Sequence, residues 1–186
     1  AAYNTNYQIT QGTDAVAMTY FGDGAVNIGS VLETMNLAAA WKLPLCFFIE
    51  NNRYAVSTKV EESTAETRLS ARGGAFNIQS WKVDGMDPLA VHLAMQEALA
   101  WMRAGKGPAV IEADVYRFFH QNGPFPGSAF GYRTKAEEQE WRARDPIALL
   151  DTRMQQRGLL AAEDAQALRQ RVKDAMVQAC GQLLEA

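Results

Sequence analysis

Two short apolar runs on either side of one helical stretch constrain the fold of this chain more than any other feature. Residues 15–21 are mostly apolar and end at Gly22-Asp23-Gly24, a pattern typical of a buried strand followed by a tight turn. Apolar residues then recur at helical spacing over 27–42, until Pro44 stops the helix. Residues 45–49 form the second apolar run, so the order is strand, helix, strand.

The same order returns in the next part of the chain. Residues 55–75 are rich in Ser, Thr, Glu and Arg without a sustained period, which indicates a mobile surface loop containing a short helix. A third strand is expected at 81–85, then a helix capped by Asp87, and a fourth strand at 109–116. This alternation predicts an α/β fold with a mostly parallel, doubly wound sheet flanked by helices.

The sequence changes character after the fourth strand. Residues 118–132 combine prolines, glycines and aromatics, which indicates a long loop. Three helices are expected to follow, at 134–142, at 146–156 and from 161 onward. We therefore predict an α/β domain over 1–132 and a helical C-terminal extension over 133–186. Residues 1–14 are expected to be the tail of a helix and a loop.

Charge and composition exclude several classes of protein. The net charge of −3 argues against broad nucleic-acid binding, which needs clustered Lys and Arg. No apolar run approaches the roughly 20 residues of a membrane span. Two isolated cysteines, Cys46 and Cys180, indicate buried or partly buried free thiols in a reducing, cytoplasmic compartment. With two histidines and no paired cysteines, a zinc site is not expected.

Polar and small residues at the two strand ends suggest a site for a phosphorylated ligand. Gly22 and Gly24 allow phosphates to approach the backbone closely, and Gly24-Ala25 is expected to open the following helix, whose amides attract anions. Asp23 and Asn52 supply oxygens from adjacent strand ends, a set that suits Mg²⁺. A Gly-Asp-Gly triplet alone is more often a plain turn. The pairing with Asn52 at one sheet edge favours a magnesium–diphosphate site.

A series of motifs resembles one known family along nearly the whole chain. The resemblance is to the alpha subunit of the thiamine diphosphate-dependent decarboxylating component of 2-oxo acid dehydrogenase complexes, and to its C-terminal portion. The matching segments are Gly22-Asp23-Gly24, Trp41-Lys42-Leu43-Pro44, Glu50-Asn51-Asn52-Arg53-Tyr54, Val83-Asp84-Gly85-Met86-Asp87, Gly105-Lys106-Gly107-Pro108, Tyr116-Arg117, Tyr132-Arg133-Thr134 and Asp145-Pro146.

The resemblance also implies roles for individual residues. Asp23, Asn52 and the backbone carbonyl of Tyr54 would hold Mg²⁺, and the amides of Gly24 and Ala25 would meet the diphosphate. Family members carry a His-x-His-Ser run after the Tyr-Arg pair, whereas this chain has a longer loop with His120 as its only histidine. His120 is therefore either a catalytic-loop residue or a plain loop contact.

The activity implied by the resemblance is oxidative decarboxylation of a small 2-oxo acid, with transfer of the acyl group to a lipoyl-bearing acyltransferase. A beta subunit would complete the active site in a heterotetramer. An N-terminal region of family members also contributes cofactor contacts, so the 186 residues alone are expected to be inactive. Two alternatives are another thiamine diphosphate enzyme, such as a transketolase, and a non-catalytic assembly fragment.

Overall fold

The structure, a computed structural model, describes residues 12–185, and most of the segment predicted as a helix tail and loop lies outside them. Four parallel strands form one sheet in the order β1-β2-β6-β5. Their bounds are Ala17–Gly22 for β1, Leu45–Asn51 for β2, Ala109–Asp114 for β6 and Gln79–Asp84 for β5. This sheet confirms the expected α/β class.

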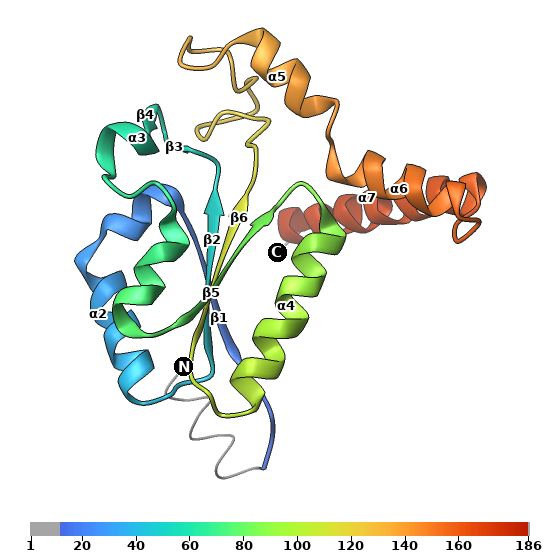
Figure 1. The fold of residues 1–186 in the computed structure, drawn as a ribbon. Helices are drawn as coiled ribbons and strands as arrows, with labels where there is room; N and C mark the ends of the chain where they lie inside the picture. Colours follow the sequence, from blue (N-terminus) through green and yellow to red (C-terminus); the bar gives the residue numbers. More distant parts are fainter. Residues whose placement is uncertain (1–11, 186) are drawn as a thin grey trace. The chain divides into compact units, whose positions relative to one another are not determined.

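Helices cover both faces of the sheet, because its central strands are apolar on both sides (Figure 1). In β2, Phe47 and Ile49 pack into the layer formed with α2 (Gly29–Ala40) and the 3₁₀ helix η2 (Leu69–Phe76). Cys46 and Phe48 point to the opposite layer, which contains α4 (Pro88–Arg103). Since successive side chains of a strand alternate between faces, this pattern is the doubly wound arrangement that the sequence predicts.

The start of the first described helix differs from the prediction. A five-residue 3₁₀ helix, η1 (Asp23–Asn27), follows β1, and α2 begins only at Gly29. Ile28 is extended between them, with φ −77° and ψ 132°. The Asn27 side chain donates to Thr64 Oγ1 at 2.9 Å and accepts from Arg72, which ties this turn to a distant segment and interrupts the helix.

The segment predicted as a mobile loop with a short helix does contain a short helix, but the rest of it is structured as well. A hairpin of β3 (Tyr54–Ala55) and β4 (Thr58–Lys59) leads into the one-turn helix α3 (Val60–Ser63), and η2 follows. Val60 and Leu69 are buried in the core, which anchors a segment whose composition is otherwise polar. The segment is therefore ordered by buried contacts, although its sequence has no helical or strand periodicity.

By contact density the chain divides between Ala143 and Arg144. Helix α5 (Lys135–Arg142) goes with the sheet, whereas α6 (Pro146–Gln156) and α7 (Ala162–Glu185) form the second unit. All three expected helices are present, and the domain boundary after 132 stays a prediction. Over residues 12–185, no helix is long and apolar enough to cross a membrane.

Candidate functional site

The two polar strand ends predicted to form the site lie side by side. Strands β1 and β2 are adjacent and parallel, with Gly22 paired to Glu50, so Asp23 and Asn52 leave the same edge of the sheet. In parallel α/β sheets this carboxyl-end edge is where ligands bind. The structure thus brings together two segments separated in the sequence by the whole of α2.

Asp23 is a buried carboxylic acid, with 3% of its surface exposed. Burial raises the pKa of Asp23 above its usual value, because the charged form loses its hydration. Backbone hydrogen bonds from Asp23 itself and from Asn52, and the positive charges of Arg117 and Arg133, oppose that rise without cancelling it. The carboxyl group therefore lies where additional positive charge would stabilise its ionised form.

Asn51 and Asn52 build the turn after β2 from two successive side-chain hydrogen bonds. Asn51 Oδ1 accepts from the Arg53 amide at 3.1 Å, and Asn52 Oδ1 accepts from the Tyr54 amide at 3.2 Å. Arg53 lies in the left-handed region with φ 67°, which turns the chain back toward the hairpin. The turn brings the backbone amide of Asn52 against the Asp23 carboxylate, and Tyr54 follows two residues later at the start of β3.

Gly24 lies against the β3–β4 hairpin. A Cβ placed on Gly24 would lie 2.6 Å from Ala55 Cβ, closer than real Cβ atoms approach, whereas Gly22 has open space around it. Gly24 and Ala25 belong to η1 rather than to the long helix, so the prediction that they open that helix is wrong. That the backbone amides of Gly24 and Ala25 bind a diphosphate stays a prediction. Gly22 is the glycine with open space in which a phosphate could approach the backbone closely.

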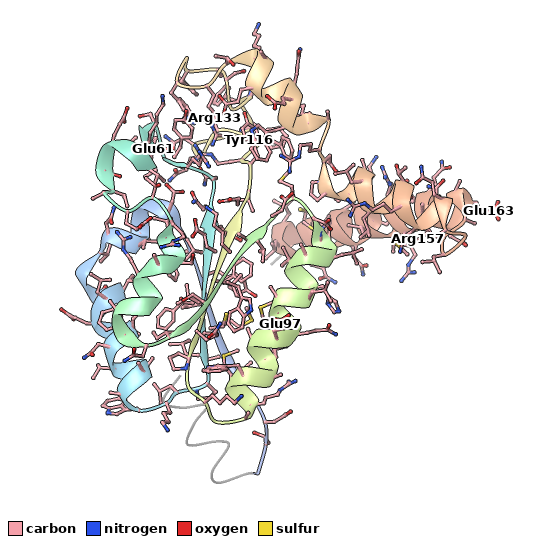
Figure 2. All side chains as sticks on the ribbon, viewed as in Figure 1. Glu61, Glu97, Tyr116, Arg133, Arg157 and Glu163 are labelled. Carbon is pink, nitrogen blue, oxygen red and sulfur yellow. The ribbon has the colours of Figure 1, made fainter. Side chains whose placement is uncertain are left out.

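Arg133 joins this turn to the loop that follows β6. Its guanidinium donates to the Asn52 carbonyl at 2.9 Å and to the Arg117 carbonyl at 2.7 Å. The same group lies over the rings of Tyr54 and Tyr116, at 4.6 and 4.4 Å from their centroids. Figure 2 shows Arg133 and Tyr116 together beyond the ends of β2 and β6. Only 3% of Arg133 is exposed, so inside the protein its guanidinium holds the turn after β2 to the loop after β6.

His120 lies in an aromatic cluster of the long loop. Its ring is 4.2 Å from that of Phe130 and 6.0 Å from that of Tyr132, and its Nδ1 accepts from the Asn122 amide at 3.2 Å. Tyr132 accepts a hydrogen bond from Arg117 at 2.9 Å, and the charge of Arg117 acts on Asp23. His120 thus belongs to a network that reaches the site, while its catalytic role stays a prediction.

A cavity of about 540 Å³ opens next to the turn. It is lined by Asn52 and Tyr54 together with residues from the end of β6 and from α5, among them Asp114 and Trp141. Asp23 does not line it. The cavity therefore lies on the β6 side of the turn, whereas Asp23 lies at the start of η1, after β1.

The oxygen atoms at this edge fit a hard cation. Asp23 offers a carboxylate, Asn52 an amide oxygen and Tyr54 a backbone carbonyl, and Mg²⁺ prefers such ligands with phosphate and water completing the shell. Over the described chain no three side chains of His, Cys, Asp or Glu gather into a cluster. A cation held by Asp23 would consequently depend on neutral oxygens and on the phosphates themselves.

From the sequence, Arg133 and Arg117 were not identified as the residues that hold the turn and act electrostatically on Asp23. Arg133 and Arg117 were singled out only as parts of matching segments, and no local pattern distinguishes them from surface arginines. The prediction for the two thiols was half right. Both cysteines are free and Cys46 is buried, but Cys180 is exposed.

The comparison with known families gives one match over nearly the whole chain. The model of the family described as dehydrogenase E1 component matches residues 2–183. A pyruvate dehydrogenase E1 component subunit alpha from Rhizobium meliloti is 41% identical over 165 residues, which make up 88% of this chain and 47% of the relative. The human mitochondrial somatic form of that subunit is 42% identical over 169 residues, covering 88% of this chain and 42% of the relative.

The chain therefore spans less than half the length of these relatives. Among solved structures, a transketolase mutant from Pichia stipitis aligns with a TM-score of 0.46 and 21% identity. That alignment covers 54% of this chain and 15% of the transketolase.

Proposed function

The chain belongs to the dehydrogenase E1 component family, and from this premise we propose that it is the cofactor-holding part of a 2-oxo acid dehydrogenase alpha subunit. The cofactor we propose is thiamine diphosphate, held by its diphosphate through Mg²⁺. The observation that carries the proposal is the buried Asp23 beside Asn52 and Tyr54 at neighbouring strand ends. When bound, the cofactor would supply the carbanion chemistry that decarboxylation of a 2-oxo acid needs.

The chain's own residues bind and orient in this scheme. Asp23, Asn52 and the Tyr54 carbonyl would hold the cation, and the open backbone at Gly22 would admit the phosphates. The bound cation would add positive charge to that of Arg117 and Arg133 and so favour the ionised form of the buried Asp23. Arg133 would keep the turn in place by its bond to the Asn52 carbonyl.

We propose pyruvate as the substrate, since the alpha subunits at 41–42% identity are named for pyruvate dehydrogenase. The partners proposed with it are a beta subunit and a lipoyl-bearing acyltransferase that receives the acyl group. The same identities favour this enzyme over a transketolase-like one. A cytoplasmic location is part of the proposal and rests only on the sequence argument about free thiols.

The test is Asp23→Asn in the full-length alpha subunit produced together with its beta subunit. We expect loss of magnesium-dependent binding of thiamine diphosphate and of carbon dioxide release from pyruvate, with assembly unchanged by size-exclusion chromatography. Asp164→Asn, on an exposed position of α7, is the matched control and should leave both measurements unchanged. Full activity of the Asp23 variant would contradict the cofactor assignment and favour the assembly-fragment alternative.

A further inference from the structure

A fully buried carboxylate lies one strand away from the proposed cation site. Glu112, in the central strand β6, has no exposed surface. Its Oε1 accepts from Asn51 Nδ2 at 2.9 Å and from Lys82 Nζ at 3.3 Å, and its Oε2 accepts from the Ser70 amide at 2.7 Å. Burying a charge is costly, and a well-packed apolar residue in such a place often gives an equally stable fold. The carboxylate therefore calls for an explanation beyond packing.

The surroundings keep Glu112 in its charged form. Burial by itself would raise the pKa of Glu112, but hydrogen bonds from Ser70 and Asn51, with the charge of Lys82, hold that pKa below its usual value. Lys82 is also 3.3 Å from Asp114 Oδ2, so its ammonium bridges two carboxylates at this edge of the sheet. A charged acceptor makes the hydrogen bond from Asn51 stronger than one between neutral groups.

The Asn51 side chain connects Glu112 to the turn after β2. Its amide donates to Glu112 with Nδ2 and accepts from the Arg53 amide with Oδ1. Because both ends of the amide are used, rotating it by half a turn would place an acceptor against the carboxylate and a donor against the Arg53 amide. The orientation of Asn51 is thus set from the sheet interior, and Asn51 is itself 97% buried, with 3% of its surface exposed.

The turn needs this support because its backbone is unfavourable. Arg53 has φ 67° and Val56 has φ 57°, and neither is a glycine. Such conformations persist only where the surroundings hold them. The Asn51 side chain fixes the amide of Arg53 itself, directly between Asn52 and Tyr54.

We propose that Glu112 is a positioning residue for the cation site. It orients Asn51, and Asn51 sets the turn that presents the Asn52 side chain and the Tyr54 carbonyl. The inference rests on the proposed function, because those two groups are cation ligands only there. A purely structural account would instead make Glu112 the counter-charge of Lys82, and the two accounts differ in what each substitution changes.

The experiment measures Mg²⁺ affinity in the full-length alpha subunit assembled with its beta subunit. Mg²⁺ is titrated at saturating thiamine diphosphate while tryptophan fluorescence is recorded. Glu112→Gln and Asn51→Ala should each weaken Mg²⁺ binding by about 10- to 100-fold, the range found when groups that orient metal ligands are removed. Lys82→Met is the comparison variant, since it removes the counter-charge but leaves the bonds from Ser70 and Asn51 to Glu112. It should therefore weaken Mg²⁺ binding clearly less than Glu112→Gln or Asn51→Ala does.

The outcomes separate the two proposals. Unchanged Mg²⁺ affinity in Glu112→Gln and Asn51→Ala, with Asp23→Asn inactive, overturns the positioning role and leaves the proposed function standing. An unmodified protein without magnesium-dependent cofactor binding overturns both. Equal weakening in Lys82→Met favours the structural account and overturns the positioning role.

A second measurement guards against a variant that does not fold. If Glu112→Gln fails to assemble, Asn51→Ala decides, because it leaves the carboxylate bonded to Ser70 and Lys82. Where both variants fold, the double variant should bind Mg²⁺ no more weakly than the worse single one, since the two residues act in series. Weakening equal to the product of the two single effects would show independent actions and overturn the relay.

Discussion

Replacing Gly24 with alanine would place a methyl group against the β3–β4 hairpin. The new Cβ would lie 2.6 Å from Ala55 Cβ, whereas ordinary contact begins near 3.4 Å. The two segments would have to separate by about 0.8 Å, the difference between these distances. Ala55 has no side-chain rotation that could relieve the contact, so the backbone itself must move.

That movement is resisted from both sides of Ala55. Arg53 and Val56 already hold left-handed backbone conformations, and Tyr54 is paired with Lys59 in the hairpin. Overpacking of this kind typically costs about 1–3 kcal/mol. We therefore expect Gly24→Ala to lower the free energy of unfolding by that amount, and to weaken cofactor binding as the turn shifts away from Asp23.

Urea denaturation monitored by circular dichroism measures the stability, with two comparison variants. Gly29→Ala should be close to neutral, because the added Cβ meets open space and Gly29 is the first residue of α2 rather than an interior one. Gly24→Ala combined with Ala55→Gly should recover most of the loss. A destabilised Gly24→Ala that the second substitution fails to rescue would refute the steric reasoning, as would a neutral Gly24→Ala.

Three further predictions concern buried groups. Arg133→Met should lower the free energy of unfolding by about 3 kcal/mol in urea denaturation. Two buried carbonyls lose a charged hydrogen-bond donor, and each such bond contributes about 1.5 kcal/mol or more. Arg133→Lys should not restore the stability, because one ammonium group lacks the planar, forked geometry of the guanidinium. Burial raises the pKa of Cys46 to about 12, so at pH 8 iodoacetamide should label the exposed Cys180 and spare Cys46, as read by mass spectrometry of the native protein. The pKa of Glu112 is lower in the folded protein than in the unfolded chain, where it is about 4.3. Ionised Glu112 therefore stabilises the fold above that pH, and this stabilisation is lost as the pH falls through the pKa of the folded protein. The stability difference between the unmodified protein and Glu112→Gln should therefore be greatest near neutral pH and shrink below about pH 4.3; a difference that grows on acidification would contradict the assignment.

The strand ends of the site were predictable because their signals are local. Apolar runs, the glycines around Asp23 and the helix stop at Pro44 each act within a few residues, and they place Asp23 and Asn52 at one edge of a parallel sheet. The capping of α4 by Asp87 was equally local, with its side chain accepting from the Leu89 amide at 3.0 Å. The order of segment 55–75 was not predictable, because it comes from two buried apolar residues, Val60 and Leu69, and not from a repeating apolar pattern.

Local sequence thus determines the α/β class, the order of the strands along the chain and the two strand ends at which we propose that a cation binds. The tertiary structure alone decides what holds those residues in position. Asn51 and Glu112 lie 61 positions apart, and Arg133 reaches back 81 positions to Asn52. A glutamate in a strand or an arginine before a helix resembles any solvated charge in the sequence. Only when the chain folds does burial force each such charge to find a specific partner, because water no longer satisfies it.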